Sequence, residues 1–237
     1  LAAQAGVRYS LTNPDQYVSS NINGFFNILD ASKNRKIAHF IYASTSSVYG
    51  NAKKFPLKES DDTDKPLSFY AASKKSNEVM AHAYSNIYKL PTTGLRFFTV
   101  YGEYGRPDMA PHKFTNAIAN NKKLDIFNYG NHVRDFTHVS DVVDAVIKLI
   151  KSMPKEKIPY KIYNIGSSNP KSIRYFLSII QNMIGKKANI KYLPLQKGDV
   201  HKTFADISLL IKKIRFKPKM DLKRGLTDYI KWFKSYY

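Results

Sequence analysis

A tyrosine and a lysine four residues apart form the most chemically informative pair in the sequence. Tyr70 and Lys74 lie in the segment Tyr70-Ala71-Ala72-Ser73-Lys74. Residues four apart on a helix share a face, so the phenol and the ammonium are expected to point into one cleft. A cation beside a phenol favours the phenolate and lowers a tyrosine pKa from about 10. The pair therefore predicts a general base, although this spacing alone is also common on ordinary helix surfaces.

A run of hydroxyl residues precedes that pair. Ser44-Thr45-Ser46-Ser47 follows the short apolar segment 39–43, which reads as a strand. Hydroxyl groups at the end of a strand can hydrogen-bond a ligand hydroxyl, but a serine-rich turn is the commoner explanation of such a run. The run lies about 25 residues before Tyr70, and this combination predicts an active site more specifically than either part alone.

The elements that must position these residues alternate between strand-like and helix-like segments. Residues 51–66 are polar and contain proline, which predicts a loop, and Ser140 with Asp141 is expected to cap a helix. Alternating strands and helices predict a parallel sheet, whose ligands lie beyond the carboxyl ends of the strands. The predicted helices cover 13–33, 69–88, 111–121, 140–150, 172–184, 206–214 and 221–236, and the predicted strands cover 39–43, 93–98, 160–165 and 189–193.

Composition limits the classes of function. The 237 residues carry a net charge of +20, but the basic residues are scattered, and no basic helix or zinc spacing accompanies them. A nucleic-acid partner is therefore not expected, whereas an anionic small substrate or a solvated Lys-rich surface fits the charge. No stretch is long and apolar enough for a membrane span, and no metal is expected, since the histidines lack metal-site spacing. The absence of cysteine excludes disulfides and is compatible with a cytoplasmic location.

Together the hydroxyl run and the Tyr-x-x-x-Lys pair resemble the extended short-chain dehydrogenase/reductases, whose catalytic set is Ser/Thr, Tyr and Lys. Further segments are similar to the nucleotide-sugar branch of that family, most closely to UDP-glucuronate 4-epimerases. They include Leu95-Arg96-Phe97-Phe98-Thr99-Val100-Tyr101-Gly102, Gly105-Arg106-Pro107-Asp108, Arg134-Asp135-Phe136-Thr137-His138-Val139 and Pro194-Leu195-Gln196-Lys197-Gly198-Asp199-Val200.

The resemblance implies a role for each matching residue. Thr45 would polarise the oxygen at sugar C4, Tyr70 would exchange its proton, and Lys74 would hold the nicotinamide ribose and tune Tyr70. The positions implied to contact NAD are Leu1, Ala2, Ala3, Asn21, Ser44, Tyr70, Lys74 and Phe98. The positions implied to contact the UDP-sugar are Arg8, Thr45, Ser46, Ser47, Thr99, Arg106, Phe127, Arg134 and Asp199.

Several of these residues have simpler interpretations. Phe98 and Phe127 are equally well explained as core aromatics. Arg134 and Asp199 could form a surface ion pair, and Arg8 could be a solvated surface residue.

Two positions bear on the reaction that the resemblance implies. Related 4,6-dehydratases carry Asp-Glu where Ser46-Ser47 stand, and related decarboxylases usually carry Glu at the Ser47 position. Without either acid, a 4-keto sugar is expected to be reduced again, which gives NAD-dependent epimerisation of UDP-glucuronate to UDP-galacturonate. Arg106 and Thr99 favour this acidic sugar. A neutral UDP-hexose or UDP-N-acetylhexosamine is the close alternative.

The family pattern begins with a glycine-rich turn that this sequence lacks, so we expect a chain without its first strands. The fold class expected is a Rossmann-like, doubly wound parallel α/β sheet with a smaller C-terminal α/β substrate-binding domain. Residues 1–105 would belong to the NAD-binding domain and 106–237 mainly to the substrate domain, with 133–165 returning to the sheet. The family also implies a homodimer built on the helices at 13–33 and 69–88. A non-catalytic remnant is the second hypothesis.

Overall fold

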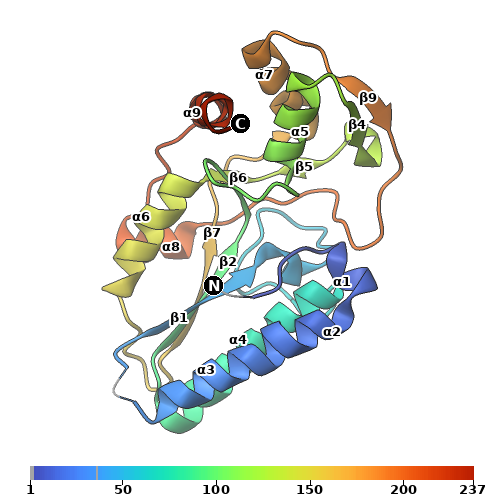
Figure 1. Cartoon of the computed structure of the whole chain (residues 1–237). Helices are drawn as coiled ribbons and strands as arrows, with labels where there is room; N and C mark the ends of the chain where they lie inside the picture. Colours follow the sequence, from blue (N-terminus) through green and yellow to red (C-terminus); the bar gives the residue numbers. More distant parts are fainter. Residues whose placement is uncertain (1–2, 36) are drawn as a thin grey trace.

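The computed structural model describes residues 3–35 and 37–237. Its centre is a parallel sheet in the order β1 (Phe40–Thr45), β2 (Thr92–Phe97) and β7 (Tyr160–Ile165). The register aligns Thr45 with Phe97 and Phe97 with Ile165, so the three strands end at one edge. Figure 1 shows α3 (Gly24–Lys33) and α4 (Phe69–Tyr88) on one side of this sheet, and α6 (Val139–Ile150) and α8 (Ser208–Ile214) on the other.

Helix α4 illustrates how local sequence sets the elements. The Ser68 hydroxyl accepts a hydrogen bond from the Ala71 N–H and begins the helix, as N-cap residues do. The helix ends at Lys89, which adopts the left-handed conformation with φ 55° before Pro91. The observed bounds agree with the predicted ones, so Tyr70 lies in the first turn of the helix and Lys74 one turn later.

The amino-terminal helical region is less regular than predicted. The single helix expected over 13–33 is present as α2 (Pro14–Tyr17), a π-helical turn (Val18–Asn23) and α3, preceded by α1 (Tyr9–Thr12). A π-helical turn widens the helix and rotates its residues relative to an α-helix. Here that turn carries Asn21, whose side chain is buried.

A second lobe lies beyond the carboxyl edge of the sheet (Figure 1). Its core contains Phe114, Phe136, Phe176, Leu226 and Phe233. Its elements are β3 (Thr99–Tyr101), α5 (Ala110–Ala119), β4 (Lys123–Ile126), a 3₁₀ turn (Phe127–Gly130), β5 (Val133–Arg134), β6 (Phe136–His138), β8 (Lys171–Ser172), α7 (Ile173–Ile184), β9 (Asn189–Tyr192) and α9 (Leu222–Tyr236). Strands β3 and β6 pair in parallel, as do β4 and β9, whereas β5 and β8 pair antiparallel. Another 3₁₀ turn, Ser46–Tyr49, follows β1.

The cap of α6 differs from the prediction. His138 is the N-cap, and its Nδ1 accepts the Ser140 N–H. The Asp141 carboxylate instead accepts the backbone N–H groups of Lys219 and Met220. Asp141 therefore fixes the chain that leads into α9.

The sheet has a separate core, to which late residues contribute. Ala205, Ile207, Leu210 and Phe216 join the cluster that contains Leu95 and Ile165. The chain therefore returns to the sheet after residue 165 as well as before it, and the predicted domain boundaries stay a prediction. Among the helices of the described residues, none combines the length and apolar character that crossing a membrane requires.

Candidate active site

The residues predicted to do chemistry lie at the carboxyl edge of the sheet. Thr45 is the last residue of β1, and its Oγ1 accepts the Ser47 N–H at 3.2 Å and lies 3.2 Å from Ser47 Oγ. The hydroxyl run therefore forms a capped 3₁₀ turn. Ser46 and Ser47 are partly exposed at this turn, whereas Ser44 is buried and donates to Glu78 Oε1 at 2.6 Å.

Tyr70 lies against Thr45. Burial raises the pKa of the Tyr70 phenol, whereas a hydrogen bond with the Thr45 hydroxyl and the charge of Arg106 lower it. The rings of Tyr70 and Tyr17 pack in a T-shaped arrangement, with ring centres 6.1 Å apart. The Tyr17 hydroxyl donates to the Gly6 carbonyl at 2.6 Å, which ties the ring to the amino-terminal loop.

Lys74 is held by the backbone of β1. Its buried ammonium donates to the Ala43 carbonyl at 3.1 Å, and burial lowers the pKa of Lys74 to about 8. Desolvation is the largest influence on the Tyr70 phenol and raises its pKa, whereas Thr45 and Arg106 lower it. That Lys74 tunes Tyr70 stays a prediction.

The Lys74 ammonium nevertheless fits a ribose. It has three N–H donors, and Ala43 is its one hydrogen-bond partner within residues 3–35 and 37–237. A buried ammonium with donors to spare suits ligand hydroxyl groups, as a nucleotide ribose would supply. Lys74 therefore passes a structural test for the NAD site that the sequence predicted.

Asn21 shapes the loop on which another predicted NAD contact, Ala3, lies. Its amide exchanges two hydrogen bonds with the Gln4 backbone, at 2.8 and 2.9 Å, and donates to Ser73 Oγ at 3.0 Å. Asn77 on α4 donates to the Asn21 carbonyl at 2.7 Å. Asn21 thus fastens the backbone beside Ala3 to α4. Leu1 and Ala2 lie outside the described residues.

Phe98 is buried in the core of the sheet, and its ring centre lies 6.4 Å from that of Tyr49. Its core interpretation is therefore observed, and a NAD contact by Phe98 stays a prediction. Thr99 is partly exposed at the start of β3, where its N–H donates to the Asp135 carbonyl.

Predicted substrate residues from four distant segments meet opposite the sheet. The Arg8 guanidinium lies 4.4 Å from the centre of the Phe127 ring, and its Nη2 lies 3.4 Å from Asp199 Oδ2. Arg134 donates to the carbonyls of Val200 and His201 at 2.7 and 3.0 Å. Asp199 therefore pairs with Arg8 rather than Arg134, and Arg134 holds the loop that carries Asp199.

Arg106 lies on the same side of the site as Arg8 and Phe127. It is close to Gly6, since a Cβ on that glycine would be 3.5 Å from Arg106 Nη2. Its guanidinium forms a two-pronged ion pair with Asp108, and both side chains are about half exposed. We call Arg8, Arg106, Phe127, Arg134 and Asp199 the loop wall, and β1, β2 and α4 with their side chains the sheet wall.

Several residues at the site were not among the predicted contacts. Glu78, Arg96 and Asn77 lie on α4 or β2 beneath the sheet edge. Glu78 follows Tyr70 and Lys74 at intervals of four, so helical spacing alone places it on their face. Within the described ranges, no group of three or more His, Asp or Glu residues has the geometry of a metal site.

A Rossmann-like sheet with Thr, Tyr and Lys at its carboxyl edge defines a class of nucleotide-dependent proteins, and comparison with known proteins specifies it. The model of the NAD dependent epimerase/dehydratase family matches residues 1–166, and the chain belongs to that family.

Known relatives match over the whole chain. Protein CapI of Staphylococcus aureus is 49% identical over 251 residues, covering 100% of this chain and 75% of that protein. A probable UDP-glucuronate 4-epimerase of Rhizobium meliloti is 41% identical over 252 residues, covering 100% and 74%. The crystal structure of UDP-glucuronic acid 4-epimerase from Bacillus cereus, in complex with UDP-glucuronic acid and NAD, superimposes with a TM-score of 0.94 at 35% identity, covering 100% of this chain and 74% of that one.

Proposed function

We propose that this protein epimerises C4 of a UDP-sugar, with UDP-glucuronate and UDP-galacturonate as the substrate and product. The observation that carries the proposal is the convergence of Thr45, Tyr70 and Lys74 at the sheet edge, next to a turn that bears no acid. The similarity to UDP-glucuronate 4-epimerases supports it.

The side chains divide the reaction between them. NAD, held in part by Lys74, would supply the acceptor and donor for the hydride at C4 of the sugar, and hydride return to the opposite face would invert that carbon. Tyr70 removes the proton of the C4 hydroxyl and later returns one to the same oxygen. Thr45 donates a hydrogen bond to that oxygen, and Lys74 donates to the ribose and thereby orients the cofactor.

The turn after Thr45 supports epimerisation over elimination or decarboxylation. Ser46 and Ser47 carry hydroxyl groups where related dehydratases, which act on sugars with a C6 hydroxyl, carry acids, and where related decarboxylases usually carry Glu at the Ser47 position. At neutral pH a serine hydroxyl remains protonated and transfers protons far less readily than a carboxyl group. A 4-keto sugar bound here is thus expected to take hydride back at C4, which completes the epimerisation.

The loop wall supports a carboxylate on the sugar. Arg106 lies near Tyr70, and Arg8 lies across the site on Phe127. A guanidinium matches a carboxylate through two parallel hydrogen bonds, so either group suits a hexuronate. Arg106 is the better placed, since its charge already acts on the Tyr70 phenol.

The substrate test is a side-by-side assay. The full-length natural protein is incubated with UDP-glucuronate, UDP-glucose and UDP-N-acetylglucosamine, and products are followed by NMR. We expect UDP-glucuronate to react at the highest kcat/KM. Preferred turnover of a neutral sugar would leave the mechanism standing and overturn the carboxylate assignment, whereas no turnover and no bound NAD would support the non-catalytic hypothesis.

We also propose that the protein is a homodimer. Helices α3 and α4 expose large apolar side chains, including Phe26, Ile28, Val79 and Ile87. Because α3 and α4 pack against each other, their exposed apolar side chains favour burial against a partner. Sedimentation of the full-length protein as a monomer at micromolar concentration would contradict it.

A further inference from the structure

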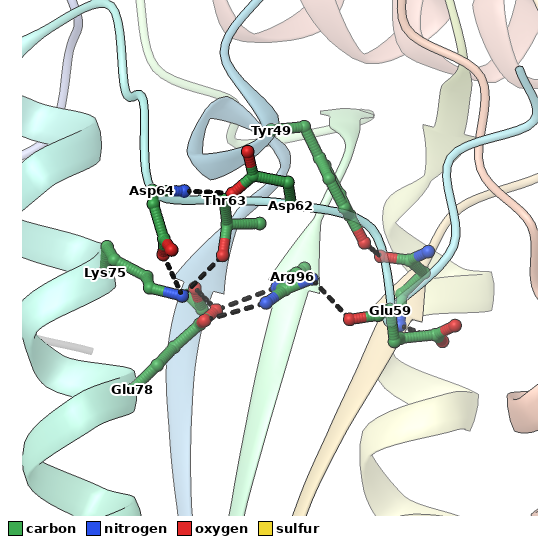
Figure 2. A network of polar contacts seen from close by, with 10 residues as sticks. Tyr49, Glu59, Asp62, Thr63, Asp64, Lys75, Glu78 and Arg96 are labelled. Carbon is green, nitrogen blue, oxygen red and sulfur yellow. Dashed lines mark hydrogen bonds and ion pairs between the residues drawn. The ribbon is translucent and has the colours of Figure 1, made fainter. Parts of the chain in front are cut away.

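A buried ion pair lies directly beneath the candidate site. Arg96 on β2 and Glu78 on α4 form two parallel hydrogen bonds, Nε to Oε1 at 2.9 Å and Nη2 to Oε2 at 2.8 Å. Their side chains are 5% and 3% exposed, and Figure 2 shows the pair at the centre of a polar network. Burying two charges carries a large desolvation cost, so such a pair is weak evidence for stability alone.

On one side the pair connects α4 to β1. Glu78 Oε1 also accepts the Ser44 hydroxyl at 2.6 Å, and Ser44 immediately precedes Thr45. One helical turn earlier, Lys74 donates to the carbonyl of Ala43 at 3.1 Å. Two consecutive links therefore fix the helix that bears Tyr70 against the strand that bears Thr45.

On the other side the pair connects to the turn and the loop around the site. The Arg96 guanidinium lies 4.8 Å from the centre of the Tyr49 ring, and Tyr49 ends the turn that contains Ser46 and Ser47. Arg96 Nη1 donates to the Glu59 carbonyl at 3.2 Å. Figure 2 shows Tyr49 and Glu59 beside Arg96, on the side away from Glu78.

The same loop is held again farther along. Lys75 on α4 contacts the Thr63 hydroxyl and lies 3.5 Å from Asp64 Oδ1. The Glu59 carboxylate accepts the Asn164 N–H at 2.8 Å, which joins the loop to β7. The network thus spans every strand of the central sheet without contacting Thr45, Tyr70 or Lys74 through a side-chain hydrogen bond.

We infer that Glu78 and Arg96 are positioning residues that set the separation and orientation of Tyr70 relative to Thr45. The inference rests on the proposed function for its meaning in catalysis. A charged pair with two parallel hydrogen bonds constrains geometry more tightly than an apolar contact of the same size, because both distances and the plane of the groups are fixed. Displacement of a reacting group by about 1 Å can lower a rate about a hundredfold.

The test uses Glu78→Gln and Arg96→Lys in the full-length protein. Both keep most of the side-chain volume and remove the paired geometry. Ser44→Ala is a milder third variant, since it cuts the link to β1 and leaves the ion pair intact. Glu156→Gln is the matched control, because Glu156 and its partner Lys161 form an ion pair whose side chains are 49% and 41% exposed.

We expect Glu78→Gln and Arg96→Lys to lower kcat about tenfold to a hundredfold at a temperature well below each Tm, with KM changed less than about threefold. The limb of the pH–rate profile that requires deprotonated Tyr70 should move to higher pH, since the phenol loses its Thr45 hydrogen bond. Ser44→Ala should lower kcat by less, and Glu156→Gln should match the natural protein.

Hydrogen exchange supplies a readout independent of turnover. Amides in residues 44–49 and 69–74 should exchange faster in Glu78→Gln than in the natural protein, and not in the control. Lower Tm values with unchanged kcat, pH profile and local exchange would overturn the inference. If the natural protein turns over no UDP-sugar, the proposed function fails, while the exchange pattern still decides whether the pair positions this edge.

Discussion

The sheet wall and the loop wall hold their charged groups in different ways. On the sheet wall, Lys74, Glu78 and Arg96 are buried and joined to the backbone or to one another. On the loop wall, Arg8 and Arg106 are about half exposed and pair with Asp199 and Asp108. Exposed pairs contribute little to stability and exchange partners easily, whereas buried ones are fixed.

The two walls are therefore expected to affect different steps. The buried ion pairs of the sheet wall keep the proton-transfer groups at fixed positions, which affects kcat. The exposed ion pairs of the loop wall can dissociate so that a guanidinium group binds a ligand, which affects KM. Substitutions on the sheet wall should therefore change catalysis or folding, and substitutions on the loop wall should change substrate affinity while the protein stays equally stable.

Tyr70→Phe should have the largest effect, since it removes the group that exchanges the proton and keeps the ring. We expect kcat to fall about 10²- to 10⁴-fold, which is the range for loss of a positioned acid–base group. The control is Tyr104→Phe, which removes a phenol oxygen from a side chain that is 78% exposed. Equal activity of Tyr70→Phe and the natural protein would remove Tyr70 from the mechanism.

Asn21→Ala should mainly affect folding. The substitution leaves the partly buried N–H and carbonyl of Gln4 without their side-chain partner. We expect the free energy of unfolding to fall by about 2–3 kcal/mol, measured by urea titration. Asn182→Ala on the exposed surface of α7, outside the proposed dimer interface, is the matched control and should change it by less than about 0.5 kcal/mol. A similar loss in both variants would show that the Asn21 contacts do not stabilise the loop.

Arg106→Ala sharpens the comparison on the loop wall. We expect KM for UDP-glucuronate to rise about tenfold, the loss expected for a charge-assisted hydrogen bond, with the unfolding free energy unchanged. Asp108→Asn should act in the opposite direction, lowering KM a few-fold by freeing the guanidinium. Steady-state kinetics with UDP-glucose as a second substrate provides the control, because a sugar without a carboxylate should respond to neither change.

The smallest expected change is that of NAD affinity with pH. The Lys74 pKa lies near 8, below its ordinary value, so the ammonium is present below that pH and is lost above it. Since a neutral amine donates more weakly, the Kd for NAD should rise a few-fold between pH 7 and 9. Calorimetry on Lys74→Met should give weaker and pH-independent binding. The same pH slope in this variant would assign the effect to another group.

The long elements of the fold were predictable because local sequence and packing agree in them. The bounds of α4 and β7 match the prediction, with Ser68 and Pro91 marking the ends of α4 and Gly166 following the end of β7. The π-helical turn at Asn21 was not predictable, since its extra residue per turn depends on contacts with Gln4 and Ser73 from other segments. The two-residue strands β5 and β8 are likewise too short to leave a sequence pattern.

The candidate site was predictable in part. Resemblance to a family predicted which residues surround it, and the structure brings Arg8, Phe127 and Asp199 together across nearly 200 positions of sequence. The pairing of Asp199 with Arg8, the position of Phe98 in the core and the upward direction of the Tyr70 pKa depend on burial and three-dimensional proximity. Those quantities have no signature in a linear sequence.

The most direct test of the central claim follows the hydrogen at C4. The full-length natural protein is incubated with UDP-glucuronate in D₂O, and the product is examined by NMR. The account predicts UDP-galacturonate that retains protium at C4, because hydride leaves and returns within the site while Tyr70 exchanges only the proton on oxygen. Deuterium at C4, or no product from protein that binds both UDP-glucuronate and NAD, would contradict it.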